Sequence, residues 1–180
     1  MLAIMNIHLK PFDKQQAEII APWFDDPETS KWLGGRDWIK NIFRLLSEPV
    51  GTEFRGAHRL ACYAYVAYGG QSPIGFIDAS VTDKYVEYGG ESDGQPIYLS
   101  SEDKITCAIS FAVNPTERQK GYGTAILHAL IDQPELKNVK IFEAGVEPEN
   151  TGSIRTLEAT GFTSNYESDF EGMYYFFLRR

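Results

Sequence analysis

The sequence predicts a single α/β domain built on a mixed, mostly antiparallel sheet of six to seven strands with about four helices. Three observations support this class. Apolar, β-rich runs alternate along the chain with helix-length segments of helical period. The 180 residues suit one hydrophobic core, because domains typically hold about 100–200 residues. No repeat, low-complexity tract or linker interrupts residues 1–180, which we therefore treat as one domain.

The first part of the chain predicts one strand and two helices. The strand covers Ile4–Leu9. Asp13 is a suitable N-cap for a helix that runs to about Phe24. A break at Asp25-Asp26-Pro27 precedes a second helix, which Asp37 caps and whose apolar residues recur with a period near 3.6.

The middle of the chain predicts three long strands and one loop. Leu60–Tyr68 and Ile74–Val81 flank a Gly69-Gly70 turn, which predicts an antiparallel hairpin. Ile105–Val113 is a third strand, apolar along most of its length. Between them, Thr82–Lys104 is rich in turn residues and is predicted to be a long loop, a kind of segment that is often functional.

The last part of the chain predicts alternating helices and strands. A helix is expected after a glycine pair, and a later helix is closed by a glycine C-cap. In order, the predicted elements are the helix Gly121–Leu130, the strand Val139–Val146, the helix Thr151–Thr160 with Gly161 as C-cap, and the strands Phe162–Tyr166 and Met173–Leu178.

The net charge of the chain argues against two classes of binding partner. The formal net charge is −8, which argues against nucleic acid and against an anionic membrane surface as partners. Thr82–Lys104 holds six acidic residues against two lysines, which accounts for −4 of that total. A cationic small molecule or peptide would suit such a surface, although acidity alone often serves only solubility.

The cysteine and histidine spacings and the hydropathy pattern argue against a metal site, a dithiol site, a signal sequence and a membrane span. Cys62 and Cys107 lie far apart in apolar runs and predict buried, reduced thiols rather than a metal or dithiol site. The three histidines have no metal-ligand spacing. The N-terminus is too short for a signal sequence, and no apolar run approaches the length of a membrane span, so we expect a cytoplasmic protein.

A strand, a short loop and two glycines before a helix predict an anion-binding cradle. Phe111–Thr124 contains this pattern, with Gly121 and Gly123 separated by one residue. Glycines let backbone N–H groups approach an anion, and the helix N-terminus adds the positive end of its dipole. Arg118 and Lys120 supply positive charge. The segment lacks the third glycine of a dinucleotide fingerprint and the Gly-Lys-Ser/Thr of a Walker loop.

A second segment, Glu149–Phe162, follows the next strand. Together the two segments resemble the GNAT superfamily of acyl-CoA-dependent N-acyltransferases. The first matches its Arg/Gln-x-x-Gly-x-Gly/Ala pyrophosphate loop, and the second matches its Asn-x-x-Ser/Ala helix that ends in Gly-Phe. The matching residues are Arg118, Gly121 and Gly123 in the first segment and Asn150, Ser153, Gly161 and Phe162 in the second.

The resemblance implies a cofactor, acetyl-CoA (coenzyme A), and a place for it. The strands Ile105–Val113 and Val139–Val146 would splay apart in the middle of the sheet and hold the pantetheine arm. Backbone amides of the loop would bind the pyrophosphate, and Asn150 would bind the pantetheine arm. The implied cofactor-binding residues are Phe111, Ala112, Val113, Arg118, Gln119, Lys120, Gly121, Tyr122, Gly123, Thr124, Asn150, Ser153 and Arg155.

The resemblance also implies direct attack of a primary amine on the acetyl thioester, which needs a proton acceptor and a donor to the thiolate. The chain has Leu157 where many members have a tyrosine acid, and Cys107 where some have a glutamate base. Ser153 is the candidate thiolate partner. Asp78 and Glu143 are the candidate bases, and a water relay to bulk solvent is the alternative to both.

The acceptor has several candidates. Trp23–Gly35 resembles the corresponding region of ribosomal-protein N-terminal acetyltransferases and of aminoglycoside 6′-N-acetyltransferases. The acceptor would be a cationic, aminoglycoside-like small molecule or a peptide N-terminus. The acid that the resistance enzymes carry in the fourth strand would fall near Ile109 or Ser110 here. The alternative is a non-catalytic, acyl-CoA-binding regulatory module, and a homodimer is left open.

Overall fold

The computed structural model describes residues 6–180, and these divide into two compact units. The first unit contains the described residues up to Ser47, together with Tyr63–Asp78 and Ser110–Lys137. The second unit contains Glu48–Cys62, Ala79–Ile109 and Asn138–Arg180. We describe each unit by itself.

The main sheet has seven strands in the order β1-β3-β4-β7-β8-β9, with β2 paired to β3. Pairing is antiparallel between β1 and β3 and between β8 and β9, whereas β7 and β8 are parallel. This confirms the predicted mixed, mostly antiparallel sheet. The strands of this sheet are β1 (Ile7–Pro11), β2 (Glu53–Phe54), β3 (Ala57–Gly69), β4 (Ser72–Thr82), β7 (Thr106–Val113), β8 (Ile141–Val146) and β9 (Tyr174–Arg179).

The first unit begins with β1, whose predicted start at Ile4 lies outside the described residues. The Asp13 carboxylate then caps α1 by accepting from the Gln16 backbone N–H at 2.8 Å, as predicted. The helix α2 was not predicted: Asp26, part of the predicted break, is its N-cap, and the Asp26 side chain accepts from the Thr29 backbone N–H. The helices of this unit are α1 (Lys14–Ile20), the 3₁₀ helix η1 (Ala21–Asp25), α2 (Pro27–Leu33), α3 (Asp37–Ser47), η2 (Pro115–Glu117), α4 (Tyr122–Ile131) and η3 (Pro134–Leu136).

The apolar faces of α1 and α3 pack on β3 and β4 and form the core of this unit. Ile20, Phe24 and Val66 are almost completely buried in it. Removing such side chains from water supplies the main stabilising free energy of a fold. Trp38 and Ile39 of α3 are half-buried against the same core, which explains the helical period of the predicted segment.

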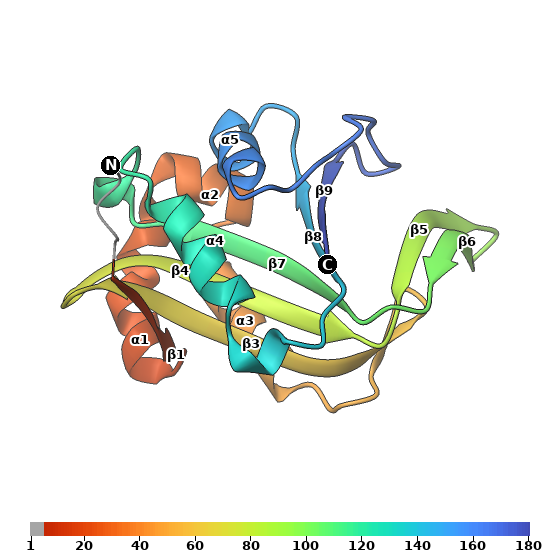
Figure 1. Cartoon of the computed structure of the whole chain (residues 1–180), viewed down its shortest axis with the longest axis horizontal. Helices are drawn as coiled ribbons and strands as arrows, with labels where there is room; N and C mark the ends of the chain where they lie inside the picture. The colour runs from red at the N-terminus through yellow and green to blue at the C-terminus, as the bar shows by residue number, and fades with distance from the viewer. Residues whose placement is uncertain (1–5) are drawn as a thin grey trace. The chain divides into compact units, whose positions relative to one another are not determined.

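The second unit contains α5 (Thr151–Ala159) and a two-stranded sheet of β5 (Tyr85–Ser92) and β6 (Gln95–Glu102). Figure 1 shows β5 and β6 as a separate ribbon at the end of this unit away from α5. The predicted long loop over Thr82–Lys104 is therefore wrong. Asp93 and Gly94 both have left-handed φ angles, of 51° and 71°, and two such residues form the tight turn of a hairpin.

A second correction concerns the chain after α5. The predicted strand Phe162–Tyr166 is absent, and in this described segment only Thr163 forms a bridge, to Phe177. A single bridge cannot extend into a strand here because Ser164–Glu167 form local side-chain hydrogen bonds instead. The predicted last strand, Met173–Leu178, is confirmed as β9.

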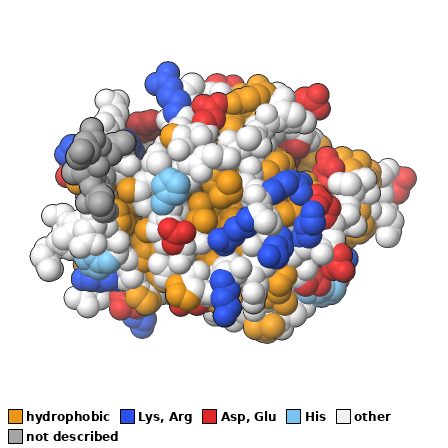
Figure 2. Space-filling model, viewed as in Figure 1, with side chains coloured by type: hydrophobic (Ala, Val, Ile, Leu, Met, Phe, Trp, Pro, Cys, Tyr) orange, Lys and Arg blue, Asp and Glu red, His pale blue; other side chains and the backbone are white. Residues whose placement is uncertain are grey.

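The β5–β6 hairpin is acidic and exposed. All of β6 from Gln95 to Ser101 is exposed, including Ile97, Tyr98 and Leu99. Figure 2 shows acidic and apolar side chains side by side over this end of the second unit. Among the described helices, none is long and apolar enough to cross a membrane.

Candidate functional site

The loop that follows β7 is fixed by one asparagine. The Asn114 backbone N–H donates to the carbonyl of Ile74 at 2.9 Å, and its side-chain amide donates to that of Pro73 at 3.0 Å. The Asn114 side-chain oxygen accepts from the Thr116 backbone N–H and hydroxyl. These bonds tie the start of the glycine loop to β4, so the loop is held on a rigid strand end.

The glycine loop presents unpaired backbone N–H groups. Gln119 and Gly121 adopt left-handed φ angles of 63° and 82°. Gly121 is the N-cap of α4, and no described side chain caps that helix. The first backbone bond of the helix runs from Ala125 N–H to the Gly121 carbonyl, so the N–H groups of Tyr122, Gly123 and Thr124 lack helical partners. Consecutive free N–H groups at a helix N-terminus form an anion-binding concavity.

The two cations of this loop are engaged by carboxylates. The Arg118 guanidinium donates to Asp26 at 2.6 Å, to Glu28 at 2.9 Å and to the Thr29 hydroxyl at 2.6 Å. Lys120 pairs with Glu117 at 2.9 Å. The sequence analysis missed the partners of Arg118, because α2 was not predicted. The backbone of the loop is therefore its free anion-binding element.

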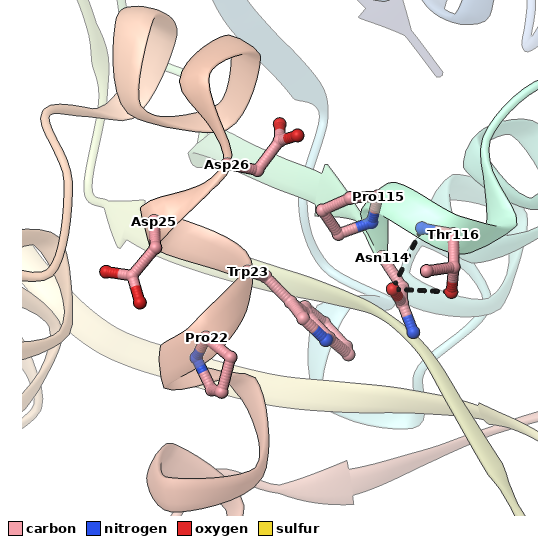
Figure 3. Close-up of a pocket in the computed structure, with 7 residues that line it drawn as sticks. All are labelled: Pro22, Trp23, Asp25, Asp26, Asn114, Pro115 and Thr116. Carbon is pink, nitrogen blue, oxygen red and sulfur yellow. Dashed lines mark hydrogen bonds between the residues drawn. The ribbon is translucent and has the colours of Figure 1, made fainter.

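A pocket of about 520 Å³ lies in the first unit between η1 and the start of η2. Figure 3 shows the Trp23 indole, from η1, reaching toward Asn114 at the end of β7. Asp25 is held by Arg36, and the Thr29 backbone N–H and the Arg118 guanidinium lower the pKa of Asp26. The lining residues are Pro22, Trp23, Asp25, Asp26, Asn114, Pro115 and Thr116. The pocket thus offers an indole and two proline rings, and its carboxylates already have cationic partners.

Asp78 is enclosed in the first unit. It lies on β4 within a run of six buried residues, and one oxygen of its carboxylate has no hydrogen-bond partner among the described residues. This enclosure raises the pKa of Asp78 to about 8. Asp78 does not face solvent, because residues on both faces of β4 are buried around it.

Glu143 belongs to the second unit and is partly exposed on β8. Among the described residues, no hydrogen bond or ion pair is recorded for its carboxylate. Burial raises the pKa of Glu143 to about 7. Its charge in turn helps to raise the pKa values of Tyr85 and Tyr175, after the larger effect of their own burial. A carboxyl group that is half protonated near neutral pH is suited to accept a proton.

The predicted residues on and around α5 lie at its N-terminus. Asn150 caps the helix by accepting from the Ser153 backbone N–H at 3.2 Å. No bond of the Ser153 hydroxyl to the described residues is recorded, and Arg155 is exposed. Leu157, in the position of the family's tyrosine acid, is completely buried, as is Cys107. Leu157 has no proton to donate, and the Cys107 thiol is sealed from solvent.

The predicted site residues therefore fall into two groups. The first unit holds Asp78 and the continuous segment Phe111–Thr124, in which Phe111–Val113 are half-buried at the end of β7. The second unit holds Glu143, Asn150, Ser153 and Arg155. At their starts, β7 and β8 pair in parallel through three residue pairs, from Thr106–Ile141 to Ala108–Glu143. The predicted splay beyond these pairs stays a prediction.

Comparison with known proteins identifies the family of the chain. Residues 12–162 match the model of the acetyltransferase (GNAT) family. The chain belongs to this family, which confirms the resemblance and the prediction of an acetyltransferase. It is 27% identical over 165 residues to the uncharacterized N-acetyltransferase YfmK of Bacillus subtilis (strain 168), covering 91% of this chain and 90% of YfmK.

Solved structures show the same fold at low identity. The aminoglycoside acetyltransferase AAC(6′)-Ib in complex with coenzyme A has a TM-score of 0.69 and 16% identity, with 97% of this chain and 95% of that chain covered. The aminoglycoside N(6′)acetyltransferase from Legionella pneumophila has a TM-score of 0.68 and 17% identity, with 97% and 92% covered. These structures confirm the fold class that the sequence predicts.

Proposed function

We propose that the protein transfers an acetyl group from acetyl-CoA to a primary amine, on a cationic small molecule or a peptide N-terminus. The observation that carries this function is the backbone cradle at Gln119–Thr124, with its two left-handed residues and uncapped helix N-terminus. The cofactor fits these residues because a pyrophosphate needs several N–H donors in a small arc, and the cradle supplies them without side chains.

The cofactor-binding residues have distinct parts in this proposal. Backbone groups of Phe111, Ala112 and Val113 would pair with the pantetheine amides. The Asn150 amide group would donate to the pantetheine arm while its oxygen caps α5. Arg118 and Lys120 are both ion-paired. They would therefore stabilise the conformation of the loop and add to its electrostatic potential rather than bind the phosphates directly. Arg155 is free to approach a phosphate from an exposed helix face.

Acetyl-CoA would supply an activated acetyl thioester when bound. The protein's own task is to move two protons: one from the attacking amine and one to the departing thiolate. Glu143 is the favoured base because its carboxylate is partly exposed and unpaired, whereas Asp78 is enclosed. The Ser153 hydroxyl is the proposed donor to the thiolate, and its backbone is fixed by the Asn150 cap. The new N–C bond forms as the C–S bond breaks.

The acceptor side is supported by charge rather than by a ligand contact. The β5–β6 hairpin carries four of the six acids of Thr82–Lys104: Glu87 and Glu91 on β5, Asp93 in the turn and Glu102 on β6. AAC(6′)-Ib has been solved with the aminoglycoside kanamycin, and a stretch of 75 residues is 35% identical to the L-2,4-diaminobutyric acid acetyltransferase of Nocardia farcinica, covering 38% of this chain and 39% of that protein. Both relatives are named for amine acceptors, which supports a small cationic amine.

The test combines acetyl-CoA binding with thiol release. We expect micromolar acetyl-CoA affinity by calorimetry, and Gly123→Trp should abolish it because the indole would fill the cradle. His128→Trp places the same indole at an exposed position of the same helix, α4, and is the matched control. Unchanged affinity in Gly123→Trp would refute the cofactor assignment of this loop.

Turnover is then measured as thiol release with aminoglycosides, polyamines and N-terminal peptides. Release with kanamycin-like amines but not with peptides would favour a small-molecule acceptor, and the reverse would favour a protein N-terminus. Binding of acetyl-CoA without release with any amine would favour the regulatory-module alternative and contradict the proposed enzyme.

A further inference from the structure

Two clusters in the second unit each combine aromatic rings with a carboxylate. The first, which we call the arginine cage, consists of Phe54, Arg55, Tyr88, Phe170 and Glu171. The Arg55 guanidinium lies 4.7 Å from the centre of the Tyr88 ring, 5.4 Å from that of Phe54 and 5.8 Å from that of Phe170. It also pairs with Glu171 at 2.8 Å. This cage holds a cation that the chain itself provides.

The second cluster, which we call the Glu143 cluster, consists of Tyr85, Glu143, Tyr175 and Phe177. Glu143 and Phe177 are register partners on β8 and β9, and Tyr175 is the partner of Gly145. Strand alternation therefore puts Glu143, Tyr175 and Phe177 on one face of this strand pair. Tyr85 packs edge-on against Phe177 with 5.6 Å between ring centres, and Tyr175 stacks on it at 6.4 Å.

Within the described part of the chain, no cation pairs with the Glu143 carboxylate, whereas Arg55 of the arginine cage pairs with Glu171. The guanidinium nearest to its rings is Arg179, 5.6 Å from the centre of the Phe177 ring. Arg179 is already paired with Glu102 at 2.8 Å and 3.0 Å. All four side chains of the Glu143 cluster are partly exposed, so a ligand can reach them.

Aromatic faces and a carboxylate together select a particular ligand chemistry. Aromatic rings attract a cation that lies within about 6 Å of the ring centre, and the gain rises when water is excluded. A carboxylate adds charge-assisted hydrogen bonds from N–H groups. Ring faces also suit methylene groups. A quaternary cation would satisfy the rings but not the carboxylate, whereas a primary ammonium on an aliphatic stem satisfies both.

We propose that the Glu143 cluster is the acceptor-recognition site and that it binds the primary ammonium group of an aliphatic amine. The inference rests on the proposed function and deepens it: the carboxylate that receives the amine's proton also selects the amine. Tyr175 contacts the ammonium group and its aliphatic stem directly in this proposal. Its ring lies over its register partner Gly145, so closely that an added Cβ would lie 3.3 Å from Tyr175 Cζ, and this places the ring on the same face as Glu143.

The probe is n-butylammonium, titrated into the full chain while amide resonances are followed by NMR, with n-butanol as the uncharged comparison. We expect saturable shifts centred on Gly145 and Tyr175, and none from n-butanol. Glu143→Gln should weaken the titration about 10-fold, and Tyr175→Leu about 3-fold. Glu53→Gln, which makes the same change at an exposed glutamate of this unit, should leave it unchanged.

Equal titration of Glu143→Gln and the parent, equal shifts with n-butanol, or shifts centred outside the cluster would overturn the inference. If Glu143→Gln does not fold, Tyr175→Leu alone decides. Acetyl-CoA binding, measured separately by calorimetry, keeps the two proposals distinct. Amine binding at the Glu143 cluster without acetyl-CoA binding would refute the proposed function alone, and acetyl-CoA binding without amine binding there would refute this inference alone.

Discussion

Asp78 on β4 and Glu143 on β8 are both desolvated carboxyl groups, but their surroundings differ. Asp78 lies among buried neighbours, and one of its oxygens is out of contact with solvent and without a partner. Glu143 is partly exposed beside Tyr85 and Tyr175. Burial raises the pKa of both, to about 8 and about 7. A raised pKa therefore does not by itself identify a base, because access to a substrate is also needed.

The largest expected effect is on kcat, and it distinguishes the role of Glu143 from that of Asp78. Glu143→Gln should lower kcat by about 10²–10⁴-fold, the usual contribution of a general base. Asp78→Asn should lower it by less than about 10-fold, because an enclosed group does not reach the amine. Steady-state thiol release with saturating acetyl-CoA measures both. The opposite ranking would transfer the role of base to Asp78, and small losses in both variants would favour a water relay.

The pH dependence of turnover sharpens the same comparison. A base must be ionised, so kcat should rise about 10-fold per pH unit below the pKa of Glu143 and level off above about 7. Tyr85 and Tyr175 face this carboxylate and stay protonated in that range because burial raises their pKa values; Arg179 lies further along β9. The rising limb should be absent in Glu143→Gln. A limb that persists there belongs to another group.

The buried carboxyl group of Asp78 should instead affect how the folding stability depends on pH. Its carboxyl pKa is 3.8 in an ordinary setting and about 8 in the folded chain. The folded state thus binds the proton more tightly, and the stability that this gives is complete below about pH 4 and is lost as the pH rises to about 8. Asp78→Asn cannot ionise, so it should be more stable than the parent above pH 8, by about 1–3 kcal/mol. Chemical denaturation at pH 5 and pH 9 measures this, and equal stability at both pH values in the parent would contradict it.

A smaller effect on kcat is expected for Ser153, which belongs to the second unit, as Glu143 does. Ser153→Ala should lower kcat by about 10-fold, since it removes one hydrogen bond to the developing thiolate charge, and should leave acetyl-CoA affinity nearly unchanged. Calorimetry and thiol release together separate these quantities. Thr156→Ala, which removes a hydroxyl from the same helix that bonds only the Gly152 carbonyl, is the control. Equal losses of acetyl-CoA affinity and kcat in Ser153→Ala would show that Ser153 has only a structural role.

The smallest effect concerns Arg118. Because its guanidinium is held by Asp26, Glu28 and Thr29, Arg118→Lys should weaken acetyl-CoA binding by only about 3-fold, through loss of the fork geometry that orders the loop. Lys120→Ala should have a similarly small effect. A 100-fold loss in either variant would make that side chain a direct phosphate ligand and would contradict the view that the backbone binds the anion.

The sequence by itself determined the fold class, the glycine loop and the family, because these depend on local patterns. Period, caps and glycine positions are properties of neighbouring residues: Asp13 is the N-cap that the sequence predicts, and α4 begins directly after Gly121, where the predicted helix starts. It missed two elements that have ambiguous local signals. An Asp-Pro pair can break a chain or start a helix, as Asp26 and Pro27 do for α2. Turn residues can fill a loop or close a hairpin, as Asp93 and Gly94 do between β5 and β6.

Tertiary structure alone decided which charges are available. Arg118 and Lys120 are free cations in the sequence but are paired in the fold. Asp78 and Glu143 are equivalent acids in the sequence, yet only Glu143 is partly exposed, against Tyr85, Tyr175 and Phe177, residues far from it along the chain. Burial and ion pairing depend on contacts between distant segments, and for that reason the chemistry of a charged side chain cannot be read from its place in the sequence.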